Sequence, residues 1–183
     1  MKKYEILKDD TVIINGRKLY RIKACSAIDN GFVKAGDFGG YIESEDNLSQ
    51  DGFAWVGDYA AVYGNAKVIE DAWVNGNARV SDFATISGNA IVTDDAEVNE
   101  SAVIAGEAMV SEYATVNGNA EITGTAKIKG HAWVHGYAAV SGDSTVAGHV
   151  DVSGYMEICD EVVEDPDDIP PVSEDDVIIG GIE

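Results

Sequence analysis

Cysteine, proline, histidine and basic residues are all scarce in this chain of 183 residues. It contains two cysteines, three prolines, three histidines and 12 lysines and arginines, against 33 aspartates and glutamates. The two thiols, Cys25 and Cys159, are too few for the disulfide framework of a small secreted domain, so we expect both to be reduced. No apolar run approaches the length of a membrane span, and no apolar stretch follows Met1. These absences predict a soluble cytoplasmic protein with no membrane contact.

A six-residue unit repeats eighteen times without a break from Gly52 to Cys159. The unit reads [Gly/Asp/Glu]-x-Ala-x-[Val/Ile]-x, with alanine third in fifteen of the units and Val or Ile two residues later in all of them. A period of six matches neither the 3.6 residues of a helical turn nor the alternation of an amphipathic strand. It is typical of a solenoid in which each side is one short strand followed by a corner.

Three such sides make one coil of 18 residues, so the eighteen units predict about six coils. Alanine suits a slot crowded by backbone, and the β-branched residue suits both a narrow interior and strand geometry. Strands of successive coils stack about 4.8 Å apart, which gives a prism roughly 30 Å tall. The sequence therefore predicts an all-β parallel β-helix in which residues eighteen apart lie on the same side.

The charge divides the chain into three predicted segments. Residues 1–51 carry a net charge of −1, residues 52–159 carry −10, and residues 160–183 carry −10. We interpret 1–51 as a capping hairpin with an entry coil, 52–159 as the β-helix, and 160–183 as an acidic tail or cap. In the last segment, acids and prolines precede the apolar run 177–182, which is expected either to dock as a C-terminal cap or to pair with a partner.

The N-terminal segment is predicted to cover the strand edge of the first coil, because an uncovered solenoid end invites aggregation. Thr11–Ile14 and Lys18–Ala24 flank Asn15-Gly16, a dipeptide that favours a tight hairpin turn. Gly39-Gly40 is the expected entry bend of an irregular first coil. Four basic residues cluster in the hairpin and indicate either a solvated strand face or a nucleic-acid contact: Arg17, Lys18, Arg21 and Lys23.

Runs such as Val116–Ile122 resemble the hexapeptide repeats of the left-handed parallel β-helix superfamily. That resemblance implies a left-handed solenoid, whereas parallel crossovers are normally right-handed. The stretches Asp37–Ile42 and Asn47–Gly52, together with the repeats, are similar to the YdcK-like hexapeptide proteins and their short relatives in phages and mobile elements. The glycine or acid here lies two places after the aliphatic residue, whereas the acyltransferases of the superfamily usually place it one residue after.

Residues suited to catalysis are few. Hexapeptide acyltransferases use a histidine as general base, and the only candidates here are His131, His135 and His149, with no long loop to build an acceptor pocket. The histidine spacing does not match the zinc-binding carbonic anhydrases of this fold, and a metal needs three convergent donors. We therefore predict no catalytic residues, no metal and no cofactor, with an acyltransferase as the alternative.

Acids and exposed aromatic residues are the candidate binding residues. The period places one set of acids on one side of the prism and a second set on the next, and the densest acidic run is Asp94-Asp95-x-Glu97-x-x-Glu100. Large rings do not fit an interior of Ala and Val, so they are expected to point outward. The predicted partner-binding residues are Asp94, Asp95, Glu97, Glu100, Asp58, Glu112, Glu70, Asp71, Glu107, Trp55 and Trp73.

These patterns favour a non-catalytic acidic interaction protein, and the resemblance implies that it is of phage or mobile-element type, with a bacterial host. A rigid row of carboxylates offers a charge lattice to proteins built to hold nucleic acid. The expected partner is a protein with a basic nucleic-acid-binding groove, of which a CRISPR effector or another defence nuclease is one version; the protein would then act as a DNA-mimicking anti-CRISPR or anti-defence inhibitor. A structural solenoid is the other non-enzymatic alternative. The aromatic residues equally permit packing under the N-terminal cap or in a homo-oligomer, either a dimer or a trimer.

Overall fold

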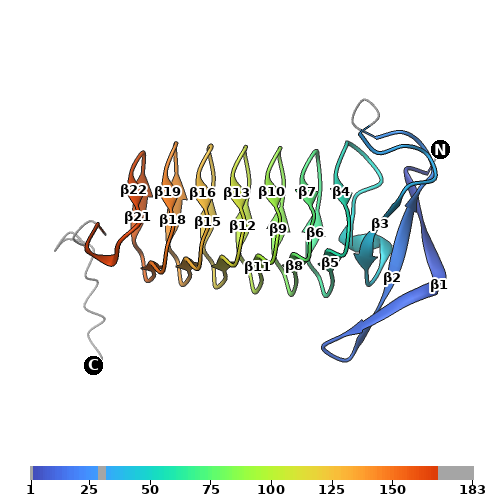
Figure 1. The fold of residues 1–183 in the computed structure, drawn as a ribbon, viewed down its shortest axis with the longest axis horizontal. Helices are drawn as coiled ribbons and strands as arrows, with labels where there is room; N and C mark the ends of the chain where they lie inside the picture. The colour runs from blue at the N-terminus through green and yellow to red at the C-terminus, as the bar shows by residue number, and fades with distance from the viewer. Residues whose placement is uncertain (1, 29–31, 169–183) are drawn as a thin grey trace, which may run out of the picture.

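A computed structural model describes residues 2–28 and 32–168 and shows a β-rod with a hairpin at its N-terminal end (Figure 1). The hairpin strands are β1 (Tyr4–Ile14) and β2 (Arg17–Ala24), and β3 (Phe38–Ile42) leads into the rod. Two single-turn 3-10 helices, η2 (Glu45–Asn47) and η3 (Pro166–Asp168), lie near the two ends of the described chain. The apolar run 177–182 and the rest of the acidic tail beyond residue 168 lie outside the described residues.

Three sheets form the sides of the rod, and the chain visits them in strict rotation. Sheet A has the order β1-β2-β3-β5-β8-β11-β14-β17-β20, sheet B the order β22-β19-β16-β13-β10-β7-β4, and sheet C the order β21-β18-β15-β12-β9-β6. The rod strands of sheet A are Ala61–Val62, Arg79–Val80, Glu97–Val98, Thr115–Val116, Trp133–Val134 and Asp151–Val152. Those of sheet B, from β4 to β22, are Trp55–Val56, Trp73–Val74, Ile91–Val92, Met109–Val110, Lys127–Ile128, Thr145–Val146 and Val162–Val163. Those of sheet C are Lys67–Val68, Thr85–Ile86, Val103–Ile104, Glu121–Ile122, Ala139–Ser141 and Glu157–Cys159.

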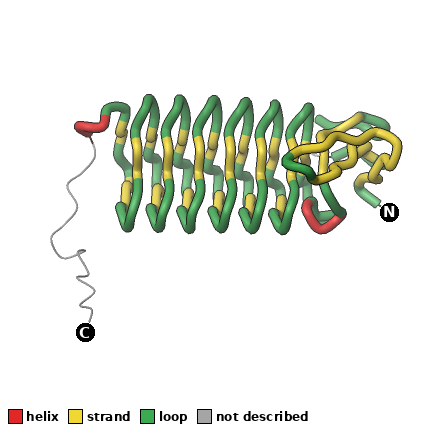
Figure 2. The backbone as a smooth tube through the Cα atoms, turned by 90° about the horizontal axis from the view of Figure 1, so that it is seen from below, coloured by secondary structure: helices red, strands yellow, loops and turns green. Residues whose placement is uncertain are grey.

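All pairs between rod strands are parallel and join residues eighteen apart through most of the rod, as Glu97 with Thr115 and Ile91 with Met109 show. This register confirms the predicted 18-residue coil, and Figure 2 shows the coils stacked in line. Sheet B contains seven strands, so the rod has one more turn than the six regular coils predicted. The extra pairing comes from outside the strict repeats, because β3 adds to sheet A, Leu48 bridges Val68, and β22 closes sheet B.

The interior follows the repeat. The third and fifth residues of the units are buried, as Ala96 and Val98 at 0% exposure illustrate, except for Met156 of the last unit, which is partly buried. The intervening fourth residue points outward, since successive side chains of a strand alternate between its two faces. The period of six therefore fixes both the core and the three outward surfaces.

The N-terminal cap is held by buried polar contacts with the first coils. The Lys3 ammonium donates to the Ala54 carbonyl oxygen at 2.8 Å, and the Tyr4 hydroxyl donates to Leu48 O at 2.7 Å. The Asn47 amide is fully buried and donates to the carbonyl oxygens of Gly64 and Ala66 at 3.1 and 2.9 Å. These bonds satisfy carbonyl groups that an uncapped end would leave free.

Gly39 and Gly40 lie within strand β3 and do not form the predicted entry bend. A Cβ atom on Gly39 would lie 2.5 Å from the Val56 carbonyl oxygen and 2.7 Å from the Trp55 ring, and one on Gly40 would overlap Ala60 O. Glycine is needed here because β3 passes directly against the backbone of the first repeats.

The basic residues of the hairpin contact other parts of the cap. The Arg17 guanidinium donates to both carboxylate oxygens of Glu43 at 3.1 Å. Arg21 donates to Gly39 O at 3.0 Å and lies within 6.0 Å of the Tyr59 ring centroid. Arg17 and Arg21 therefore take part in the packing of the cap itself, an arrangement that neither of the two interpretations of the cluster included.

Candidate protein-interaction face

The first residue of every repeat unit occupies a left-handed corner. Twelve of these slots hold glycine and six hold an acid, and all have positive φ, from 50° at Asp58 to 73° at Gly106. Glycine adopts this region without strain, Asp tolerates it, and Glu is unfavourable there. The six corner acids are Asp58, Glu70, Asp82, Asp94, Glu100 and Glu112.

Each corner acid is bonded to the next coil. Its carboxylate accepts the backbone N–H of the residue eighteen positions later, which is the equivalent corner one coil further on. The donor and acceptor residues are Gly76 to Asp58 at 3.1 Å, Gly88 to Glu70 at 2.6 Å, Glu100 to Asp82 at 3.3 Å, Glu112 to Asp94 at 3.0 Å, Gly118 to Glu100 at 2.8 Å and Gly130 to Glu112 at 3.0 Å. The corner acids therefore have a structural role that composition alone did not indicate.

This bonding fixes the positions of the charges. A carboxylate that accepts a backbone N–H at a corner loses rotamer freedom when the chain folds and none further on binding. One bond uses only part of the acceptor capacity of a carboxylate, and all six corner acids remain exposed to solvent. The rod thus presents anionic groups at regular, predetermined positions.

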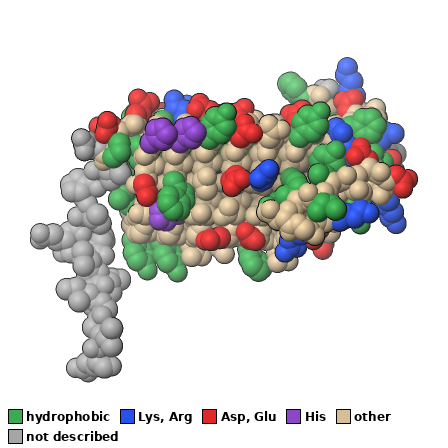
Figure 3. All heavy atoms as spheres, turned by 60° about the horizontal axis from the view of Figure 1, so that its bottom comes forward, with side chains coloured by type: hydrophobic (Ala, Val, Ile, Leu, Met, Phe, Trp, Pro, Cys, Tyr) green, Lys and Arg blue, Asp and Glu red, His purple; other side chains and the backbone are tan. Residues whose placement is uncertain are grey.

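The outward surface of sheet A carries the densest set of these groups. This surface, which we call the carboxylate face, comprises the outward side chains of β5, β8, β11 and β14 and the corners on either side of them. One corner supplies Asp58, Asp94, Asp95 and Glu112, the strand β11 supplies Glu97, and the other corner supplies Asp82 and Glu100. Figure 1 places β5, β8 and β11 along the lower edge of the rod, and Figure 3 turns this edge forward to show carboxylates along both borders of the face.

The charge density of this face is about half that of duplex DNA. Seven carboxylates and the guanidinium of Arg79, which pairs with Glu97 at 3.4 Å, give a net charge of −6 over four successive coils. Four coils at about 4.8 Å each correspond to roughly 19 Å of rod. The same length of duplex carries about eleven phosphate charges at about 1.7 Å per charge. Sequence reasoning identified most of these acids but not Asp82, whose signal is its position in a slot otherwise held by glycine.

The structure separates the remaining predicted residues from this face. Glu70, Asp71 and Glu107 lie on the corner between sheets C and B, opposite the carboxylate face. Asp71 accepts the Phe53 N–H at 2.9 Å. Trp73 lies on sheet B and is partly buried, whereas Trp55 is only 3% exposed beneath the cap. Trp55 therefore does not point outward for a partner but packs under the cap, one of the arrangements left open for the aromatic residues, because β3 and its glycines lie against the ring.

The sheet A side of the rod carries aromatic and histidine side chains in its C-terminal half. Tyr113, His131 and His149 stack along one corner with ring centroids 5.0 and 4.8 Å apart, as the register of eighteen residues requires. His135 lies 2.9 Å from an Asp151 carboxylate oxygen and stacks on Trp133 with a centroid distance of 4.0 Å. The histidines are the purple side chains in Figure 3. Among residues 2–28 and 32–168, no group of three or more metal-ligating side chains is arranged to hold an ion.

The chain is a parallel β-solenoid, compatible with the hexapeptide-repeat superfamily. No family model matches its sequence, and none of the curated proteins matches it either. In the described part of the chain, no helix is both long and apolar enough to cross a membrane.

Proposed function

We propose that this protein is a non-catalytic interaction protein whose carboxylate face occupies a basic nucleic-acid-binding surface of a partner protein. The observation that carries this proposal is the set of carboxylates fixed by backbone N–H groups in a regular row, at about half the charge density of duplex DNA. Fixed charges complementary to a basic groove increase the association rate and select partners by charge pattern. The partner class is a DNA- or RNA-processing protein, and inhibition of a CRISPR effector or another defence nuclease is the version we favour.

Selection for solubility alone would explain acids spread evenly over the surface. The three sides differ, however. Glu97 and Asp151 occupy the outward strand slots of sheet A within the repeats, and Glu121 and Glu157 occupy those of sheet C, whereas sheet B has no acid in these slots. The charge is therefore arranged by face, which supports a directional contact.

Two variants with equal charge test the proposal. The first carries Asp58→Asn, Asp94→Asn, Asp95→Asn and Glu112→Gln on the carboxylate face. The second carries Glu70→Gln, Asp71→Asn, Glu107→Gln and Asp143→Asn on the opposite corner. Amides can still accept the corner N–H bonds, so both variants are expected to fold, and both lose four negative charges.

The measurement is capture of bacterial lysate proteins on each variant, with a 20-base-pair DNA duplex as competitor and salt varied between captures. We expect wild type and the opposite-corner variant to retain the same nucleic-acid-binding proteins, and the duplex to displace them. We expect the carboxylate-face variant to retain at least tenfold less of these nucleic-acid-binding proteins than wild type. Equal loss in both variants would show that net charge alone attracts the proteins, and capture that the duplex does not affect would refute mimicry.

An acyltransferase is the second candidate, and one observation favours it. The Asp151 carboxylate holds the His135 ring at 2.9 Å, as a partner that orients a general base would. Turnover of an acyl-coenzyme A thioester that is lost in His135→Ala and in Asp151→Ala would establish this activity. Turnover unaffected by either substitution would exclude this pair as its base.

A further inference from the structure

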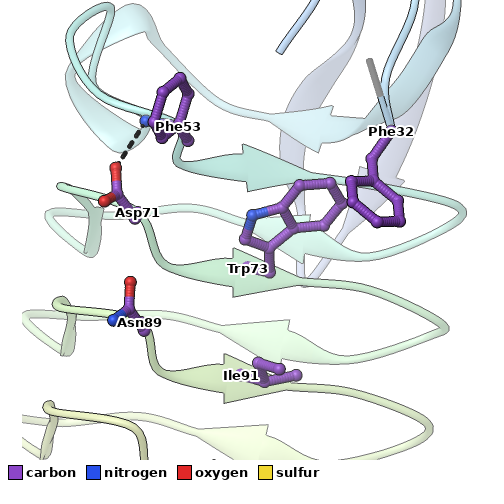
Figure 4. A pocket seen from close by; sticks show the side chains of 6 residues that line it. All are labelled: Phe32, Phe53, Asp71, Trp73, Asn89 and Ile91. Atoms are coloured by element: carbon purple, nitrogen blue, oxygen red, sulfur yellow. Dashed lines mark hydrogen bonds between the residues drawn. The ribbon is translucent and has the colours of Figure 1, made fainter. Parts of the chain in front are cut away.

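Sheet B presents a column of apolar side chains on its outward surface. The column, which we call the apolar column, runs through Trp73, Ile91 and Met109 in β7, β10 and β13. All three side chains are only partly buried in the rod. Beside the column lies an open cavity of about 530 Å³ lined by Phe32, Phe53, Asp71, Trp73, Asn89 and Ile91. Figure 4 shows the indole of Trp73 extending toward Phe32 across this cavity.

Two lysines follow the apolar column toward the C-terminal end of the rod. Lys127 lies in β16, which pairs directly with β13, and Lys129 is two residues later. They are half of the four basic residues between residues 52 and 159. In the same coil the adjoining corner holds Gly124 and Thr125, and the acids of that corner lie one coil away, Glu107 on one side and Asp143 on the other. Neither lysine forms an ion pair with another of the described residues.

The C-terminal sequence has the complementary pattern. Glu174, Asp175 and Asp176 precede the apolar run Val177-Ile178-Ile179, which is followed by Gly180-Gly181 and Ile182. From the C-terminal end of the rod toward the cap, sheet B presents the two lysines first and the apolar column next. A segment that runs in this direction would place its acids beside the lysines and its apolar residues on the column.

The distances agree with this direction. With Asp176 beside the lysines, an extended chain that advances about 3.3 Å per residue reaches the Met109 level near Val177 and the Ile91 level near Ile179. The two glycines then lie over the bulky Trp73, and Ile182 reaches the cavity beside Phe53. The chain leaves the rod after β22 of the same sheet B, two strands beyond β16, or roughly 10 Å away. Residues 169–175 can span that distance with slack.

We propose that residues 174–182 of the chain dock in cis along sheet B, with their acids on Lys127 and Lys129 and their apolar residues on the apolar column. Docking from the same chain brings the segment to its site at an effective concentration in the millimolar range. The segment covers apolar surface that would otherwise remain exposed. This surface is distinct from the carboxylate face and does not depend on the proposed function.

Disulfide trapping in the full chain tests the contact. In a Cys25→Ser, Cys159→Ser background, the pair Ile91→Cys with Ile179→Cys is compared with Thr85→Cys and Ile179→Cys. Thr85 lies in the same coil as Ile91 but on sheet C, so it controls for proximity along the rod. With oxidised glutathione as oxidant, we expect the first pair to close within one chain at least tenfold faster than the second. Equal rates would overturn the proposal, and disulfide-linked dimers would identify a second copy as the occupant.

Charge reversal distinguishes docking at the proposed site from nonspecific hydrophobic association of the segment with the rod. Lys127→Glu with Lys129→Glu is expected to slow closure of the Ile91 and Ile179 pair at least fivefold. Replacing Glu174, Asp175 and Asp176 with lysine in the same chain is expected to restore it. In the chain without engineered cysteines, amide hydrogen exchange is expected to be slowed at residues 177–182 and to lose this protection on lysine reversal. Exchange at these amides as fast as in an unstructured peptide would contradict docking without reliance on any variant.

Discussion

The corner at Asp94 offers the sharpest test of the structural role of the acids. The Asp94 backbone has φ of 60°, and its carboxylate accepts the Glu112 N–H at 3.0 Å. A substitution at Asp94 can remove the hydrogen bond to Glu112, place a strained side chain at positive φ, or remove the negative charge. Three variants separate these effects. Asp94→Ala removes the bond and leaves a Cβ-bearing residue in the left-handed region. Asp94→Gly removes the bond but adopts positive φ without strain. Asp94→Asn keeps a side chain that accepts the bond and tolerates positive φ, so it removes only the charge.

The expected losses in the free energy of unfolding follow from these contributions. A side-chain cap of this kind contributes about 1 kcal/mol, by analogy with a helix N-cap. Alanine in the left-handed region costs about 1 to 2 kcal/mol more than glycine. We therefore expect Asp94→Ala to lose about 2 to 3 kcal/mol and Asp94→Gly to lose about 1 kcal/mol, since glycine avoids the strain but raises the entropy of the unfolded chain. Asp94→Asn should remain within about 0.5 kcal/mol of wild type.

Urea denaturation followed by circular dichroism measures these differences at a fixed protein concentration. Asp95→Ala is the matched control, because Asp95 is exposed at the same corner and its carboxylate accepts a hydrogen bond from the Asn77 side-chain amide, at 3.1 Å, and from no backbone N–H of the next coil. The decisive result is the order of stability: Asn above Gly, and Gly above Ala. If the alanine and glycine variants unfold at the same urea concentration, or if Asp95→Ala costs as much as Asp94→Ala, the left-handed corner cap does not stabilise the rod.

Three further outcomes follow from the packing. Ala96→Phe is expected to destabilise the protein by about 3 kcal/mol through overpacking of a fully buried slot, measured against Asp95→Phe; equal melting temperatures would show that Ala96 does not face the core. Asn47→Ala should cost about 3 kcal/mol, because it leaves buried carbonyl groups without donors, whereas a similar loss in the exposed Asn65→Ala would contradict this reason. Burial lowers the pKa of Lys3 from 10.5 to about 8, so the unfolded chain binds more protons above pH 8; stability relative to Lys3→Met should rise by up to about 1.4 kcal/mol per unit between pH 8 and 10, and a flat difference would refute it.

The rod was predictable because each six-residue unit contains one side of the coil. The place of a residue within its unit shows whether that residue lies at a corner, in the core or on the outward surface. The antiparallel pairing of β1 and β2 around Asn15-Gly16 was also predictable, since that dipeptide favours one tight turn. The burial of Trp55 was not predictable, because it depends on how closely β3 approaches the first coil. The period assigned each acid to a side of the prism, but the bonds of the corner carboxylates require the geometry of two stacked coils. The candidate face was therefore predictable in membership and not in the way its charges are held.

The register of eighteen makes the position of every charge depend on the number of residues that precede it. Deletion of residues 76–93 would remove one coil and leave every later side chain on its original side. Deletion of only 76–81 would turn the following chain by one third of the circumference, moving Asp94 and Glu112 to the corner between sheets C and B and Glu100 to their former corner. Insertions and deletions in this protein therefore rotate all later side chains about the rod axis by a fixed angle for every six residues gained or lost. Steps of a whole coil lengthen or shorten the carboxylate face, and shorter steps redistribute its charges.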